Sequence, residues 1–138
     1  MSEQQNLDVV RRGYDAFGRG DLDALLSTFD DDIEWTSPGP KELPTSGTRR
    51  GREQVRDFFR IVNELWDIQR FEPKTFVAQG DTVVVLGEDT AVFRPTNATL
   101  NEAWAHAFVL KNGKIVRFHE YIDTAAAVAE LHASRIKA

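Results

Sequence analysis

The spacing of apolar residues predicts three helices in the first half of the chain. Residues 6–17 carry apolar side chains at intervals of three and four, with charged residues between them. Asp21 is placed to cap a second helix over residues 22–29. The widest apolar stripe predicts a third helix near residues 52–66, which must lie on another layer of the protein.

Alternating apolar and polar residues predict strands in most of the remaining chain. A short strand over residues 33–37 follows the second helix, and residues 38–47, rich in Pro, Ser and Gly, form a loop long enough to cover a pocket. Further strands are expected over residues 69–78, 82–94, 102–110 and 114–122, followed by a short alanine-rich helix from residue 125 to about 134. Helices on one face of a curved antiparallel sheet make an α+β fold, and the length fits a single domain over residues 1–138.

The hairpin around Asn112 and Gly113 contains the most informative pattern. A two-residue turn would pair His106 with His119, whereas a three-residue loop would pair His106 with Phe118. A slip of one residue moves a whole strand to the other face. We choose the three-residue loop, because it separates bulky apolar side chains from small and polar ones. The bulky face then contains Trp104, His106, Phe108, Leu110, Val116, Phe118, Glu120 and Ile122.

His106 and Glu120 are the polar residues on this apolar face, as diagonal neighbours. Burying both costs several kcal/mol unless they pair or meet water, so the face indicates a pocket; a hydrated rim is the alternative. Apolar neighbours should raise the pKa of Glu120 toward neutrality, which suits a general acid or base, and His106 would orient it or polarise a substrate oxygen. The alternatives are a structurally paired carboxylate and a core histidine.

Other side chains are candidates for the pocket wall. Tyr14 faces the sheet at helical spacing, so its hydroxyl can reach the pocket or lie at the edge of the core. We expect the substrate also to contact Trp35, Ser37, Trp104, Phe108 and Phe118.

Charge and composition exclude several classes of function. A net charge of −5 argues against nucleic acid and anionic membranes as partners. We interpret the basic cluster of Arg49, Arg50 and Arg52 as the start of a helix, with contact to an anionic ligand group as the alternative. A polar N-terminus and the lack of a long apolar run favour the cytoplasm and no membrane span. Without cysteine, and with histidines on different elements, no metal or cofactor is expected.

Short motifs along nearly the whole chain match one family. They are Tyr14-Asp-Ala-Phe17, Gly20-Asp-Leu-Asp23, Asp31-Asp-Ile-Glu-Trp35, the helix start at residues 51–59, Trp104-Ala-His106, Gly113-Lys-Ile115 and Glu120-Tyr-Ile-Asp-Thr124. In these motifs the chain resembles the SnoaL-like and ketosteroid-isomerase-like branch of the nuclear transport factor 2 (NTF2) superfamily. The resemblance implies a cone-shaped, cystatin-like fold, a conical pocket for a small apolar molecule, and a homodimer formed through the outer sheet face. The same fold hosts isomerases, cyclases, dehydratases, epoxide hydrolases and non-catalytic binding domains.

Steroid isomerisation is disfavoured by three departures from the family pattern. Ser37 replaces the expected base, His106 replaces the expected oxyanion aspartate, and the family tyrosine falls on Gly13 rather than Tyr14. The SnoaL-like polyketide cyclases resemble the chain better. They keep an acid/base carboxylate on the final strand and a histidine on the neighbouring strand, where Glu120 and His106 stand.

Two interpretations of function follow. In the first, Glu120, helped by His106, moves a proton on an apolar carbonyl-containing compound. In the second, the same pocket belongs to a non-catalytic ligand-binding or dimerisation module. An epoxide hydrolase of this fold would need an Asp-Arg-Asp set, and the sequence leaves open whether the comparable residues, Glu88, Asp89 and Arg94, face one another.

Overall fold

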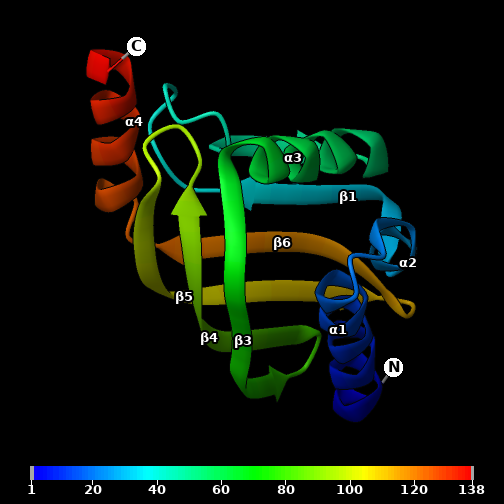
Figure 1. Ribbon diagram of the computed structural model, residues 1–138. Coiled ribbons are helices and arrows are strands. Elements are labelled where there is room, and N and C mark those ends of the chain that lie inside the picture. Colours follow the sequence, from blue (N-terminus) through cyan, green and yellow to red (C-terminus); the bar gives the residue numbers. More distant parts are fainter. Residues whose placement is uncertain (1, 138) are drawn as a thin grey trace.

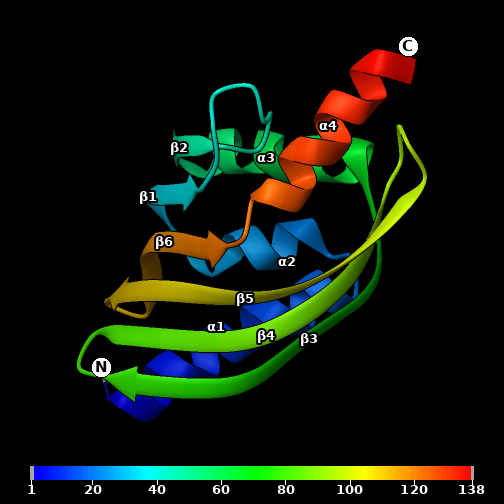
Figure 2. The same ribbon diagram turned by 90° about the vertical axis from the view of Figure 1, so that its left-hand side faces the viewer.

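Six strands form one curved sheet in the computed structural model, which describes residues 2–137, and helices cover its concave face (Figures 1 and 2). The helices are α1 (Glu3–Gly18), α2 (Leu22–Ser27), α3 (Arg52–Leu65) and α4 (Ala125–Lys137). The strands are β1 (Phe29–Ser37), β2 (Gly47–Arg50), β3 (Trp66–Gln79), β4 (Thr82–Phe93), β5 (Ala98–Lys111) and β6 (Lys114–Ile122), in the spatial order β2-β1-β6-β5-β4-β3. This arrangement confirms the predicted α+β fold.

Local capping explains where α1, α2 and α4 begin. Ser2 and Gln5 form a reciprocal capping box at the start of α1. Asp21 caps α2, as predicted. Asp123 accepts the backbone N–H of the first residue of α4 at 3.0 Å, which turns the chain from β6 into the closing helix. No helix in the described range has the length and apolar character of a membrane span.

The first two strands differ from the prediction. β2 was not predicted: it begins at the last residue of the expected loop, continues into the expected start of the third helix, and pairs antiparallel with the end of β1. β1 itself runs parallel to β6, so the sheet is mixed rather than entirely antiparallel. Both pairings join segments with little local signal: β2 is only four residues long, and β1 and β6 are separated by most of the chain.

The basic cluster of Arg49, Arg50 and Arg52 makes hydrogen bonds and ion pairs with other parts of the chain. Arg49 donates to two backbone carbonyls of the loop 38–46. Arg50 pairs with Glu34 at 2.8 Å, and Arg52 donates to a backbone carbonyl of β1. Arg52 is the first residue of α3, as interpreted, whereas Arg49 and Arg50 lie in β2 instead; all three guanidinium groups contact other parts of the chain.

The turn between β5 and β6 is two residues long, so the predicted three-residue loop is wrong. Leu110 pairs with Ile115 across the turn, and the two turn residues, Asn112 and Gly113, have φ angles of 53° and 79°. Positive φ at both central positions is the geometry that an Asn-Gly hairpin turn prefers.

A bulge just after this turn restores the predicted faces. Val116 is the extra residue of β6, and beyond it Phe108 lies opposite Phe118. The two-residue turn shifts the register by one residue and the bulge by one more, so the alternation between faces returns to the predicted one. His106 therefore lies directly opposite Glu120, instead of diagonally.

The concave face of β4, β5 and β6 carries the core. Its buried side chains pack with those of α1 and α3 in one continuous cluster, which includes Val10, Val55, Val85, Phe108 and Phe118. Gly87 belongs to this face and lies opposite Trp104, whose indole occupies the space that a side chain at Gly87 would fill. A Cβ atom there would lie 2.3 Å from the indole ring, so glycine is required.

Candidate functional site

A cavity of about 180 Å³ lies between the helices and the concave sheet. Its wall is mainly apolar and rich in aromatic rings, with Tyr14, Trp35, Phe58, Phe71, Phe108 and Phe118 among the lining residues. The loop 38–46 and α4 complete its rim. An engineered apolar cavity of about 150 Å³ binds benzene, so this space admits a molecule with at least one ring.

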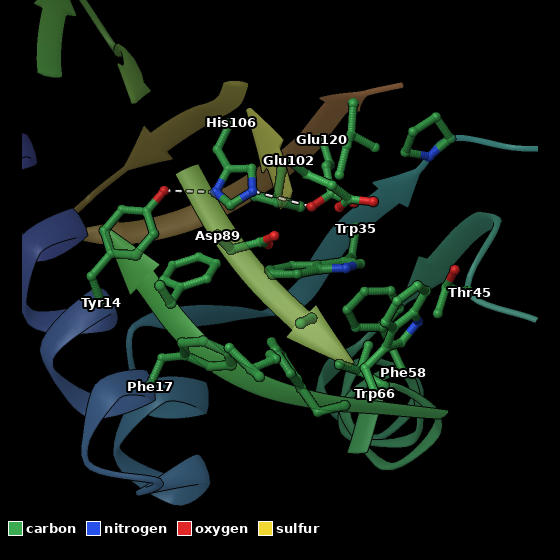
Figure 3. A pocket seen from close by; sticks show the side chains of 18 of the residues that line it. Tyr14, Phe17, Trp35, Thr45, Phe58, Trp66, Asp89, Glu102, His106 and Glu120 are labelled. Atoms are coloured by element: carbon green, nitrogen blue, oxygen red, sulfur yellow. Dashed lines mark hydrogen bonds and ion pairs between the residues drawn. The ribbon is translucent and has the colours of Figure 1, made fainter. Parts of the chain in front are cut away.

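Three side chains from three elements form a hydrogen-bonded relay in this cavity (Figure 3). The Tyr14 hydroxyl of α1 lies 2.7 Å from Nδ1 of His106 on β5. Nε2 of His106 lies 3.2 Å from Oε2 of Glu120 on β6. The predicted proximity of His106 and Glu120 is thus confirmed, and Tyr14 joins them.

Burial determines the protonation states within the relay. His106 is only 6% exposed, and this burial lowers its pKa, against the opposing effect of the neighbouring Glu120 carboxylate. A neutral imidazole then donates from Nε2–H to Glu120 and accepts the Tyr14 hydroxyl at Nδ1. Burial, followed by the charge of Glu120, raises the pKa of Tyr14 well above its usual value, so this hydroxyl keeps its proton.

Aromatic rings fix the plane of the imidazole. Trp104 stacks on His106 with ring centroids 3.9 Å apart, and Phe118 approaches its edge at 4.9 Å. Trp104 can lie this close to the sheet because Gly87 has no side chain. The packing holds His106 in the orientation that serves both of its hydrogen bonds.

Glu120 keeps one carboxylate oxygen for a ligand. Its side chain is 25% exposed and borders the cavity, while Oε2 faces His106. Within residues 2–137 no side chain or backbone group forms a hydrogen bond with Oε1. A ligand in the cavity can therefore exchange a proton with Oε1 while the relay holds the carboxylate in place.

Asp89 and Glu102, like Asp123, are further carboxylic acids that line the cavity. Burial and the charge of Glu120 raise the pKa of Asp89 to about 6. Burial, followed by the charges of Asp89, Glu120 and Asp123, raises the pKa of Glu102 to about 7. The facing of Asp89 could not be decided from the sequence, and Glu102 was not among the predicted site residues. The alternation of β5 carried the signal, because Glu102 shares a face with Trp104 and His106.

The predicted substrate-contacting residues divide into two groups. Tyr14, Trp35, Phe108 and Phe118 line the cavity. Ser37 and Trp104 are buried but are not among its lining residues, so they differ from the expectation of direct contact. Trp104 is covered because it stacks against the sheet and His106, and it supports the site from behind.

The structure separates the set that resembled an epoxide hydrolase. Arg94 donates to a backbone carbonyl at the end of α3, at 3.0 Å. Glu88 pairs with Lys74 at 2.9 Å, away from the cavity. Only Asp89 of this set lines the cavity, so the Asp-Arg-Asp arrangement is absent there. No three His, Asp or Glu side chains in the part of the chain that the structure describes are grouped to hold a metal ion.

Comparison with known proteins identifies the family. The family model described as a SnoaL-like domain matches residues 10–118. The chain belongs to the SnoaL-like domain family. The uncharacterized protein Rv0034 of Mycobacterium tuberculosis is 32% identical over 133 residues, which cover 91% of this chain and 95% of that protein.

Solved structures share the fold of this SnoaL-like protein. An NTF2-like protein of Burkholderia xenovorans is 37% identical, with a TM-score of 0.84 over 94% of this chain and 97% of that one. TerC, co-crystallized with polyporic acid, is 27% identical, with a TM-score of 0.82 over 91% of this chain and 96% of that one. Together these findings show that the chain has an NTF2-like fold.

Proposed function

We propose that this SnoaL-like protein binds a small aromatic or apolar molecule that bears a carbonyl group, and that Glu120 transfers a proton on it. The observation that carries the proposal is the relay from Tyr14 through His106 to Glu120, which ends at the wall of an apolar cavity. Oε1 of Glu120 has no hydrogen-bond partner within the described residues, so it is available to a ligand.

The relay gives each residue a distinct role. Glu120 takes a proton from a carbon next to the ligand carbonyl and later returns it to another atom. His106 donates from Nε2–H to the carboxylate and fixes its orientation. Tyr14 donates to Nδ1 and so selects the imidazole tautomer that can do this. Exclusion of water by the aromatic wall strengthens these interactions.

Deuterium incorporation into a ketone tests this function without knowledge of the natural substrate. We expect the protein to accelerate exchange of the α-protons of an aromatic ketone such as 1-indanone in D₂O, followed by ¹H NMR. Glu120→Gln should reduce the enzymatic exchange by a factor of at least about 10², because general base catalysis is worth that much. The amide oxygen can still accept from His106, so the fold should be preserved.

Glu88→Gln is the matched control, because Glu88 pairs with Lys74 away from the cavity. It should leave the exchange rate unchanged. Equal rates for Glu120→Gln and the unmodified protein would contradict the role of Glu120.

Binding without turnover is the second candidate. It is favoured by the closure of the relay, because each nitrogen of His106 already has a partner within the protein. Polyporic acid is a suitable probe for it, since TerC was co-crystallized with that compound. Saturable binding of polyporic acid, together with no exchange of any ketone, would favour this second function over the first.

A homodimer through the outer face of β4, β5 and β6 remains a proposal from the family resemblance. On that face Ala105 lies between Leu86 and Tyr121, which are 47% and 56% exposed. Light scattering after size exclusion should give the mass of a dimer, and Ala105→Arg should convert it to a monomer. Ala129→Arg, on the exposed side of α4, should not. A monomeric unmodified protein would contradict this interface.

A further inference from the structure

Asp89 and Glu102 form a carboxyl pair that the relay does not use. They are direct partners on the neighbouring antiparallel strands β4 and β5. Both side chains extend from the sheet into the same part of the cavity as Glu120 (Figure 3). Like charges directly opposite each other destabilise a sheet, so an ionised pair here is costly.

The surroundings of the pair supply little compensation for two negative charges. Within the described residues, neither carboxylate forms an ion pair, and Oδ1 of Asp89 is buried without a hydrogen-bond partner. The nearest cation, Arg70 on β3, is held by Glu72 at 3.1 Å. The titratable or charged groups that face the pair are Glu120, Asp123, Arg70, His106 and Tyr14.

An unpartnered donor in the same cavity indicates which ligand group belongs there. Trp35 is 6% exposed and lines the cavity, yet its Nε1–H is buried without a hydrogen-bond partner among residues 2–137. Buried indole N–H groups usually find an acceptor. An oxygen-bearing ligand supplies one, whereas a protonated amine does not.

We propose that Asp89 and Glu102 share one carboxyl proton and present it to a carbonyl or hydroxyl oxygen of the ligand, as the acid partner of Glu120. This inference rests on the proposed function and names the ligand class as neutral, oxygen-bearing and aromatic or apolar. The pair is the acid because no group among residues 2–137 donates a hydrogen bond to it, and Glu120 is the base because it accepts from His106.

The two groups complete a balanced proton transfer. Glu120 removes a proton from the carbon next to the carbonyl, and the C–H electron pair forms the carbon–carbon double bond of an enol. The carbonyl π electrons take the proton of the carboxyl pair to form the enol O–H. The pair becomes ionised while Glu120 becomes neutral, so the net charge of the site does not change. Return of a proton to carbon and to the pair restores the protein.

Carbon-detected NMR of the carboxyl groups tests the shared proton directly. Asp89 and Glu102 should titrate near pH 6 and pH 7, as burial and their neighbours' charges require. In Asp89→Asn the midpoint of Glu102 should fall, because a neighbouring negative charge is removed. Midpoints of both groups near the ordinary value of about 4 would overturn the proposal.

Three matched fragments test the ligand class: acetophenone, benzylamine and benzoate. We expect acetophenone to bind about tenfold more weakly at about pH 8.5, where the pair is ionised, than at about pH 6.5, where it holds one proton, the loss of roughly one hydrogen bond. This pH dependence should disappear in the double variant Asp89→Asn/Glu102→Gln, which keeps the shapes but cannot titrate, and persist in Glu88→Gln. At the higher pH, benzoate should be the weakest binder of the three fragments.

The possible results distinguish a failure of the acid role of the pair from a failure of the proposed function. Acetophenone that binds equally at both pH values would overturn the acid role of the pair and leave ligand binding intact. Stronger binding of benzylamine as the pH rises would overturn it also, because the pair would then act as an anionic site for amines. Failure of all three fragments to shift any cavity resonance would contradict both the pair and the proposed function.

Discussion

Glu88 and Asp89 are neighbours on β4 that face opposite sides of the sheet. On the outer side, Lys74, followed by the weaker effect of Arg70, lowers the pKa of Glu88. On the inner side, burial and the charge of Glu120 raise the pKa of Asp89 to about 6. The pKa of the same chemical group thus shifts in opposite directions one residue apart, because the outer face places Glu88 beside Lys74, whereas the inner face buries Asp89 near Glu120 with only the weaker opposing charge of Arg70.

The same contrast extends across the neighbouring strands. The inner face of β5 carries Trp104, His106 and Phe108 in close aromatic contact. The positions between them, which face outward, are small alanines. Side chains inside are held by packing and by hydrogen bonds that cannot be exchanged with water. The outer face relies on exposed ion pairs, which are individually weak. Substitutions on the two faces should therefore change the stability of the protein by different amounts and, for some pairs of residues, in opposite directions.

Gly87→Ala should have the largest effect on the inner face. Its Cβ atom would lie 2.3 Å from the Trp104 indole and 2.6 Å from a backbone oxygen of Glu72. Overpacking of this kind costs about 1–3 kcal/mol, and we expect the upper end because a backbone atom must also move. Chemical denaturation measures the loss. Gly18→Ala, with no atom within 4 Å of its Cβ, is the control and should cost nothing; similar losses for both would contradict the packing argument.

Tyr14→Phe should cost about 1–2 kcal/mol of stability, because it leaves Nδ1 of buried His106 without a donor. The imidazole ¹⁵N shifts should also change, since the hydroxyl selects the tautomer. Tyr121→Phe on the outer face removes the same atom from a side chain that is 56% exposed, and should change neither quantity. An unchanged ¹⁵N spectrum in Tyr14→Phe would contradict the hydrogen bond between Tyr14 and His106.

Glu102→Gln should stabilise the protein at high pH. The folded pKa of about 7 lies above the ordinary value of 4.5, so the folded state holds this proton more tightly than the unfolded state does. That contribution to stability is complete below pH 4.5 and is lost as the pH rises through about 7. At about pH 8 the variant should therefore gain about 1 kcal/mol over the unmodified protein, after allowance for solvent screening.

Glu88→Gln should change the pH dependence of stability in the opposite direction. Its folded pKa is lowered, so its stabilising contribution is present above the ordinary pKa and is lost in acid. Thermal unfolding at several pH values compares the two variants. A fall in stability at high pH for Glu102→Gln would contradict the assignment of opposite environments to the two faces.

Glu34→Ala should have the smallest effect. Glu34 pairs with Arg50 at 2.8 Å and with Arg117 at 3.1 Å on exposed parts of the sheet. Such pairs contribute less than about 1 kcal/mol, and salt screens them. We expect the loss to shrink further in about 1 M NaCl, as measured by urea denaturation. A large loss that persists in salt would show that outer-face ion pairs matter as much as inner packing.

The sequence by itself determined the elements and the faces of the hairpin strands. Helical spacing and strand alternation located α1, α3 and β3 to β6 within a few residues, because these patterns follow directly from backbone geometry. Alternation also placed His106 and Glu120 on one face, and this survived an error in the loop length because a turn and a bulge each shifted the register by one residue.

Only the tertiary structure decided what those faces meet. The hydroxyl of Tyr14 reaches His106 across 92 residues of sequence, and the parallel pairing of β1 with β6 brings Trp35 beside Phe118. Long-range contacts of this kind depend on how whole layers pack, and no local pattern encodes them. The tertiary structure likewise stacked Trp104 on His106 instead of placing it in the cavity wall. It also placed Asp89 beside Glu102, where burial raises the pKa values of both carboxyl groups.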